Sequence, residues 1–243
     1  MNLAQLTRKD HGHLRLDPGK AAAAAANVHL VPLVRSELRK AASQFPVFFA
    51  KDGETGQFYL AALMGLEPHE NLHWNGEALD AEYTPLNLLR LPFYVGGRDA
   101  EGGVICIDLD SPAVGETGPC AILEADGSDS RYMVTVQAVL SELAGQKAPT
   151  RAFIERAVSM KLLIETKLDV AYDNGTRASL SGLYGVDERA LGRRLGEIAE
   201  FDDVMSLAAM ALSLEHVAGL VRRKNARLAA EAEWLGQDPG KLS

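Results

Sequence analysis

The feature that most constrains the fold is Asp173-Asn174-Gly175, which lies between two strand-like runs, 167–172 and 177–186. An Asn-Gly pair between such runs is the strongest short-range signal for a β-hairpin, because a tight turn needs residues that readily adopt positive φ. A second hairpin is predicted where the apolar runs 46–51 and 57–66 are joined by a short glycine-containing loop. Hairpins join neighbouring antiparallel strands, so we predict a mainly antiparallel sheet.

Helices are predicted mainly in the second half of the chain. Ser130 and Asp187 can each cap the first turn of a helix that follows them, and Pro149-Thr150 starts another. A last, long helix runs from about residue 202 to residue 233. Because strands and helices do not alternate regularly, a doubly wound parallel sheet is not expected. We predict an α+β fold, with the helices packed on one face of the sheet.

The first half adds two short helices and three strands to this pattern. In chain order they are a strand at 28–34, a helix from the N-cap candidate Ser36 to Gln44, a helix at 85–90, and strands at 93–96 and 104–109. Pro32 cannot donate a backbone hydrogen bond, which indicates that the first of these strands lies at a sheet edge. A glycine-rich turn between Gly96 and Gly103 joins the last two strands.

The length of the chain permits one large domain or two small ones. The chain has 243 residues, 47% of them hydrophobic, which is enough to bury a substantial core. No internal repeat or long linker divides the sequence. We therefore predict a single domain at 28–233, preceded by a polar, alanine-rich lead-in at 1–27 and followed by a flexible tail at 234–243.

The acidic charge balance argues against nucleic-acid binding. The formal net charge is -8, and contacts with phosphates require a basic face. The one basic cluster comprises Arg222, Arg223, Lys224 and Arg227, near the end of the long helical pattern. Cations near the end of a helix interact favourably with its dipole, so we interpret the cluster as a structural part of the helix.

Three features lead us to expect a soluble cytoplasmic protein. The longest apolar helical stretch, 205–220, is shorter than the about 20 residues that span a bilayer. The alanine run at 21–26 is short and follows a polar segment, unlike the apolar region of a signal peptide. Cys106 and Cys120 form no C-x-x-C pair and no plausible disulfide framework, which fits a reducing compartment.

The segment 69–73 matches a metal-binding motif. His69, Glu70 and His73 spell H-E-x-x-H, in which two histidines on one helix face bind zinc and the glutamate activates a water molecule. Asn75-Gly76 would end such a helix within about two turns, and Leu79 occupies the position of the third histidine in the extended motif. We therefore favour histidines of an ordinary turn over a zinc site.

A second candidate metal motif ends a predicted strand. Asp108 and Asp110 follow an apolar run, and carboxylates two residues apart on a strand project to the same face and can reach one divalent cation. Aspartates at strand ends also cap the turn that follows, as Ser111-Pro112 would favour here. A polar contact with a ligand is a third interpretation, and the residues alone leave all three open.

Several separated segments resemble, in order, the SapC family of bacterial proteins. They are His29-Leu30-Val31-Pro32, Phe45-Pro46-Val47-Phe48-Phe49, Gly56-Gln57-Phe58, Gly65-Leu66 with Asn71-Leu72, Tyr83-Thr84-Pro85 with Arg90 and Pro92-Phe93, Ile105-Cys106-Ile107-Asp108 with Ser111, Thr150 to Phe153, and Gly182 to Glu188. Together they span roughly residues 28–220. The peptide-transporter permease of the same name is a different protein with membrane spans.

The resemblance implies partners more than it implies an activity. The family is associated with surface-layer protein export. Its members look like companions of flavin-dependent halogenases, cupin-like oxygenases and outer-membrane uptake receptors. A partner enzyme in a halogenase or oxygenase type of pathway is therefore the expectation that follows from the resemblance.

Residues within the resembling segments offer a candidate ligand site. They supply an imidazole, a phenol, a cation and two carboxylates at the ends of predicted strands or helices, namely His29, Tyr83, Arg90, Asp108 and Asp110. If these side chains converge, they suit a zwitterion such as an amino acid or a peptide. The structural alternative is that Arg90 forms an ion pair with Asp108, and that His29 is an ordinary histidine of an edge strand.

Two classes of function follow from these observations. We favour an accessory or binding protein without catalysis or a cofactor of its own, which recognises an amino-acid-like or peptide ligand or a partner enzyme. The alternative is a metal-dependent enzyme that uses Asp108 and Asp110 or, with less support, His69, Glu70 and His73. An oligomer or a structural complex formed through the long C-terminal helix is a third expectation.

Overall fold

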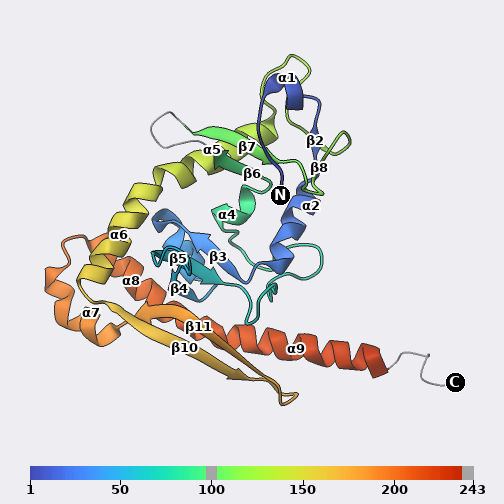
Figure 1. Ribbon diagram of the computed structural model, residues 1–243. Coiled ribbons are helices and arrows are strands. Elements are labelled where there is room, and N and C mark those ends of the chain that lie inside the picture. Colours follow the sequence, from blue (N-terminus) through green and yellow to red (C-terminus); the bar gives the residue numbers. More distant parts are fainter. Residues whose placement is uncertain (97–102, 237–243) are drawn as a thin grey trace.

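A five-stranded antiparallel sheet forms the centre of the molecule (Figure 1). The computed structural model describes residues 1–96 and 103–236. The strand order is β10-β11-β4-β5-β3. The strands are β3 (Leu30–Leu33), β4 (Val47–Lys51), β5 (Phe58–Leu63), β10 (Leu163–Ala171) and β11 (Arg177–Val186). Every neighbouring pair in this sheet is antiparallel, which confirms the predicted α+β class with its mainly antiparallel sheet.

Both predicted hairpins are present. β4 and β5 pair from Val47 with Ala62 to Lys51 with Phe58, and β10 and β11 pair along nearly their whole length. Gly175 adopts a φ of 85° in the second turn, a conformation that glycine reaches without steric cost. The prediction from Pro32 is also confirmed, because β3 is an edge strand of the sheet.

Helices cover both faces of the central sheet, which corrects the prediction that they lie on one face. Side chains alternate along β4, so that Val47 and Phe49 join one buried cluster whereas Phe48 and Ala50 join another. The first cluster contains residues of α3 (Leu38–Ala42), α6 (Lys147–Ser159) and α8 (Phe201–Ser213). The second contains Leu220 of α9 (Val217–Gly236). A central strand with two buried faces reads as a continuous apolar run, as β4 does.

The predicted long C-terminal helix is confirmed, with one irregular turn. α8 and α9 follow each other and are joined by the 3₁₀ turn η4 (Leu214–His216). α9 runs along β10 and β11 and projects beyond them (Figure 1). By length and composition, one helical segment among the described residues could cross a membrane. It runs over 34 residues, Phe201–Trp234, and its most apolar window has a mean hydropathy of 1.7.

Burial in the core of the protein also explains why this segment is apolar. A core helix of a soluble protein meets the same length and composition criterion. Leu207 and Met210 are buried in the first cluster, and Leu220 is buried in the second. The segment alone therefore gives only weak evidence for a membrane span.

Local capping signals are confirmed at two helices and corrected at two others. Ser130 accepts a hydrogen bond from the Met133 N–H and starts α5 (Arg131–Gly145), and Asp187 accepts one from Ala190 to start α7 (Glu188–Arg194). Ser36 is not an N-cap: it lies within the 3₁₀ turn η2 (Arg35–Glu37), and its hydroxyl donates to Glu142. α6 begins at Lys147 and not at Pro149.

Two smaller sheets lie beside the central one and include the N-terminal segment. The first has the order β1-β7-β6, and the second has the order β8-β2-β9. Their strands are β1 (Leu3–Gln5), β7 (Val104–Asp108), β6 (Phe93–Gly96), β8 (Val114–Gly115), β2 (Arg15–Leu16) and β9 (Cys120–Ala121). The helical elements of this part are α1 (Arg8–His11), α2 (Pro18–Ala23), η1 (Ala24–Asn27) and α4 (Leu86–Leu89). Leu16 is buried beneath α5, so the predicted lead-in 1–27 packs into the fold.

Two predictions concern residues that are outside the described ranges. The glycine-rich turn predicted between Gly96 and Gly103 falls largely on residues 97–102. The predicted flexible tail, 234–243, is described only as far as residue 236, and up to that point it continues α9.

The 3₁₀ turn η3 (Leu195–Glu197) completes the elements between α7 and α8.

Candidate functional site

The H-E-x-x-H segment does not form a helix. It lies in consecutive turns, and His69 has a φ of 61°, which no regular helix contains. The Glu70 carboxylate accepts a hydrogen bond from Lys224 at 2.6 Å and another from the Leu66 N–H at 3.1 Å. Nowhere in the described ranges do three or more histidine, cysteine, aspartate or glutamate side chains form a group that could hold a metal ion. The geometry therefore lacks the shared helix face that the zinc motif needs.

The basic cluster of α9 holds this segment in place. The earlier interpretation, that these cations only interact with the dipole at the end of their own helix, is therefore corrected. Lys224 donates to Glu70 and, at 2.9 Å, to Glu67. Arg223 binds Asp80 at 2.7 Å, and Arg227 donates to two backbone carbonyl groups of the segment. Burial alone would lower the pKa of Lys224, but the two carboxylates raise it overall. Lys224 is therefore a charged side chain whose partners neutralise it inside the protein.

His73 is the least satisfied polar side chain of the segment. It is only 8% exposed, and its ring meets the Phe45 ring edge-on, with 4.8 Å between the centroids. Burial, assisted by the positive charge of Arg223, lowers the pKa of His73 to about 4, so the imidazole is neutral at pH 7. Its Nε2 atom is buried and has no hydrogen-bond partner among the described residues. Buried polar atoms without a partner are rare in native proteins.

His73 lines a polar cleft of about 690 Å³, which we call the His73 cleft. Its other lining residues are Ser43, Gln44, Asn75, Leu79, Asp80, Ala81, Glu82 and Arg223. The hydrogen bond from Arg223 lowers the pKa of Asp80, so this carboxylate is ionised at neutral pH. The cleft thus presents a cation, two carboxylates, a neutral imidazole, two amides and a hydroxyl, from the turn after α3, the 73–82 loop and α9.

Arg90 and Tyr83, two of the five predicted ligand residues, have structural partners. The Arg90 guanidinium donates to Asn87 at 2.8 Å and to the Phe93 carbonyl at 2.9 Å, and it stacks on the Tyr94 ring. The predicted ion pair between Arg90 and Asp108 is therefore wrong. The Tyr83 hydroxyl donates at 2.8 Å to Glu37, a buried carboxylate.

The other three predicted residues lie apart from these contacts. Asp108 accepts from the backbone N–H groups of Asn2, at 2.8 Å, and of Asp110, at 3.2 Å, as a turn-capping aspartate does. The Asp110 carboxylate pairs with the N-terminal ammonium group at 3.2 Å. Burial, and to a smaller extent His69, lowers the pKa of His29. Apart from the hydrogen bond that Asp108 accepts from the Asp110 N–H, no hydrogen bond or ion pair in the described part of the chain joins any two of the five.

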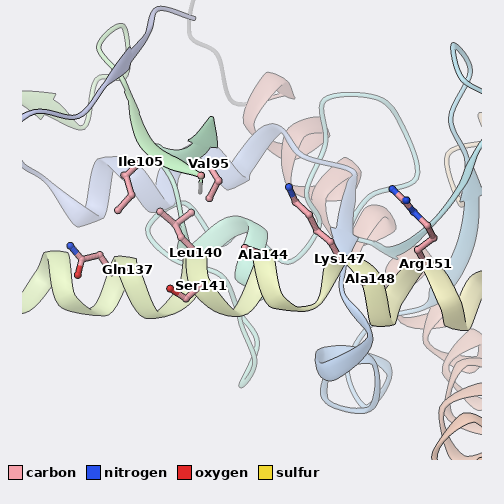
Figure 2. A pocket seen from close by; sticks show the side chains of 10 residues that line it. Val95, Ile105, Gln137, Leu140, Ser141, Ala144, Lys147, Ala148 and Arg151 are labelled. Carbon is pink, nitrogen blue, oxygen red and sulfur yellow. The ribbon is translucent and has the colours of Figure 1, made fainter. Parts of the chain in front are cut away.

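A second cavity, of about 680 Å³, lies between α5–α6 and the strands β6 and β7, and we call it the α5–α6 cavity. Figure 2 shows Val95 and Ile105 on the strand side, opposite Leu140 and Ala144 of α5. Lys147 and Arg151 of α6 project on the same side of the helix, beyond this apolar part. The remaining lining residues are Gly103, Gln137, Ser141 and Ala148.

Sequence reasoning missed Arg223, Asp80, Glu82 and Gln44 as site residues, and it interpreted His73 only as a histidine of an ordinary turn or, with less support, as a zinc ligand. One local signal was available, since four cations stand within six positions of a helix whose other face is apolar. The partners of these cations, however, lie about 150 positions earlier in the chain: Glu70, for example, is 154 positions from Lys224. Contacts between residues so far apart in the sequence cannot be recognised from a local sequence pattern.

Comparison with known proteins assigns the chain to a family. The family model described as SapC matches residues 6–220, and so extends the predicted resemblance toward the N-terminus. The matched range includes every residue of the His73 cleft except Arg223. No curated protein and no solved structure matches the chain. Because the match covers well over half of its length, the chain belongs to the SapC family.

Proposed function

We propose that the protein binds a small zwitterion, a free amino acid or a short peptide, in the His73 cleft. The observation that carries the proposal is the His73 side chain, which lines a polar cleft and whose buried Nε2 atom has no hydrogen-bond partner in the described part of the chain. A bound ligand that donates a hydrogen bond to this nitrogen would satisfy it. The neutral imidazole is suited to accept such a bond.

The charges of the cleft support a ligand of mixed sign. Asp80 and Glu82 suit an ammonium group, and Arg223 suits a carboxylate, which guanidinium groups bind through two parallel hydrogen bonds. The side chains of Arg223 and Asp80 are 40% and 58% exposed, and an ion pair this exposed is worth at most about 1 kcal/mol. A zwitterion can therefore replace the ion pair with contacts of its own at small cost.

A ligand screen on the purified protein tests the proposal. Native mass spectrometry first reports any retained ligand, and isothermal titration calorimetry with the twenty amino acids and a dipeptide set then identifies binders. We expect Glu82→Gln and Arg223→Gln to weaken binding about tenfold. Two nearby exposed residues that do not line the cleft provide matched controls, Glu77→Gln and Arg222→Gln. Binding that is unchanged in both cleft variants, or absent for the whole set, contradicts the proposal.

Native mass spectrometry also distinguishes a binding protein from the competing class of function, a metal-dependent enzyme. A stoichiometric divalent metal ion in freshly purified protein would favour the metal-dependent enzyme over a binding protein. The Asp108→Asn variant would then lose the metal if Asp108 and Asp110 hold it. A small organic ligand that is retained by the wild-type protein but absent from the Arg223→Gln variant would favour the binding protein.

A protein partner is a second candidate function, favoured by the exposed face of α8. Phe201, Met205 and Leu212 are 76%, 39% and 74% exposed, and their spacing places all three on one side of the helix. We propose this stripe as the contact surface for a second copy of the chain. Light scattering with size-exclusion chromatography tests self-association: Phe201→Ser with Leu212→Ser should convert a dimer to monomer. A monomeric wild-type protein contradicts the second copy.

A further inference from the structure

A third cavity, of about 370 Å³, is lined by residues of α2, α4 and α5, and we call it the α2–α5 cavity. Ala21, Leu88 and Val136, one from each helix, are buried, so the inner wall belongs to the core. Leu89 also lines the cavity and is 48% exposed, which places it where the cavity opens to solvent. The volume lies within the range of known small-molecule sites.

The alanine run near the N-terminus is what leaves this space open. Ala21, Ala22 and Ala25 line the cavity together with Pro18, and the four positions recur at the spacing of one helix face. Because an alanine side chain ends at its Cβ atom, this face leaves unfilled the volume that longer side chains would occupy. The segment predicted as an alanine-rich lead-in therefore forms one wall of a cavity.

The cavity is mainly apolar, and none of the described residues that line it is charged. Its polar side chains are three hydroxyls and an indole, those of Thr84, Tyr132, Thr135 and Trp74. The Tyr132 hydroxyl and the Trp74 indole N–H make no hydrogen bond with any described residue. Burial raises the pKa of Tyr132, so its hydroxyl keeps its proton at neutral pH and can donate a hydrogen bond.

We infer that the α2–α5 cavity binds a neutral, mainly apolar molecule with a flat ring body and one oxygen that accepts a hydrogen bond from Tyr132. The rings of Trp74 and Tyr132 favour an aromatic body, and such a body would shield the exposed side chain of Leu89 from water. An ionised ligand is disfavoured, because an unpaired charge is costly to bury and no described lining side chain offers an opposite charge.

The inference concerns a different ligand and a different site from the zwitterion in the His73 cleft. Among the described residues, Leu79 alone lines both spaces. Arg223, which should bind the carboxylate of a zwitterion, does not line the α2–α5 cavity. Either proposal can therefore fail without the other.

Calorimetric titration with 2-naphthol at pH 7, where this probe is neutral, tests the inference. Ala22→Phe should fill part of the cavity and weaken binding at least about tenfold. Its matched control is Ala23→Phe, because Ala23 is the next residue of α2 and does not line the cavity. Both alanines are exposed, so we expect both variants to fold.

Two further comparisons test the chemistry of the ligand. Tyr132→Phe removes the hydroxyl and should weaken the binding of 2-naphthol about fivefold, as the loss of one hydrogen bond does, while naphthalene binds as before. Tyr184→Phe is the matched control, since Tyr184 does not line the cavity. 2-Naphthoate, which has the same rings and a negative charge, should bind at least about tenfold more weakly than 2-naphthol.

Each outcome supports or overturns a stated part of the inference. One saturable site that Ala22→Phe weakens, and that Ala23→Phe and Arg223→Gln retain, supports it. No saturable binding to the wild-type protein overturns it, and binding that Ala22→Phe leaves unchanged overturns the location. Equal binding of 2-naphthoate overturns the assignment to a neutral ligand, and an unchanged affinity in Tyr132→Phe overturns the hydrogen bond. A wild-type dimer that Leu89→Ser converts to a monomer would mean that a second copy of the chain covers the cavity, which also overturns the inference.

Discussion

Lys224 of α9 donates a hydrogen bond of 2.6 Å to Glu70, and both side chains are about nine-tenths buried. The contact joins the last helix to the segment that matches the zinc-protease motif. It determines what Glu70 does: a carboxylate bound to an ammonium group is an anchor and is not free to activate water. Arg223 and Arg227, on the same helix, fix the loop that forms one side of the His73 cleft.

The first prediction concerns this buried pair. Lys224→Met leaves the Glu70 carboxylate buried without its cation, and removing one partner of such a pair costs about 3–5 kcal/mol. Urea denaturation at pH 7 measures the loss. The matched control is Arg222→Met, an exposed cation two positions earlier, which should change the free energy of unfolding by less than about 0.5 kcal/mol. An equal effect of both substitutions would show that Lys224 contributes no more than a surface charge.

The second prediction is a dependence of stability on pH that comes from His73. Its pKa is lowered from 6.5 to about 4 in the folded protein, so the unfolded chain binds more protons between these values. Stability therefore falls as the pH drops from 6.5 to 4, by up to about 3 kcal/mol for this group. Denaturation curves of wild type and His73→Gln at pH 7 and pH 4.5 test this. The variant should lose part of the decrease, and identical pH profiles would refute the assignment.

The third prediction concerns the buried carboxylate of Glu37, which accepts hydrogen bonds from the Tyr83 hydroxyl, the Leu86 N–H and the Val34 N–H. Tyr83→Phe removes one donor and should lower the free energy of unfolding by about 1–3 kcal/mol. Tyr184→Phe serves as the control, since the Tyr184 hydroxyl has no hydrogen bond with a described residue. Tyr83 would be free to act in ligand binding only if its substitution left stability unchanged.

The fourth prediction tests whether α9 covers a second face of the sheet. Leu220→Ala removes a side chain that is 1% exposed, and substitutions of this kind cost about 2–5 kcal/mol. Leu212→Ala, in the same helical segment but 74% exposed, should have almost no effect. Thermal unfolding followed by circular dichroism measures both. A small loss in Leu220→Ala would indicate that α9 is only loosely attached.

Local patterns predicted the parts of the fold that local physics determines. Asn174-Gly175 forms its hairpin turn, Ser130 and Asp187 cap their helices, and Pro32 lies on an edge strand, because each depends on a few neighbouring residues. The burial of both sheet faces was missed, although the unbroken apolar run of β4 indicates it. The sequence analysis recognised that run only as one strand of a hairpin, and it placed every helix on one side of the sheet.

The candidate site was predicted less well because its contacts join distant parts of the chain. The chemistry expected of the ligand site, a cation with two carboxylates and an imidazole, is present in the His73 cleft, but through other residues than those predicted. Arg90 and Tyr83 have the right groups and use them for structural contacts. Which of several suitable side chains meet in space depends on packing, and packing cannot be seen in the spacing of residues along a sequence.

The strand order also determines when the central sheet can be completed during synthesis. β4 pairs on one side with β5, which follows it closely, and on the other side with β11, which ends at Val186. At about 5–20 residues per second, a ribosome needs roughly 10 s to make the chain between them. During that time the β4 edge, with its run of apolar residues, has no partner strand. We therefore expect the nascent chain to depend on chaperones that cover exposed strand edges until the second hairpin emerges.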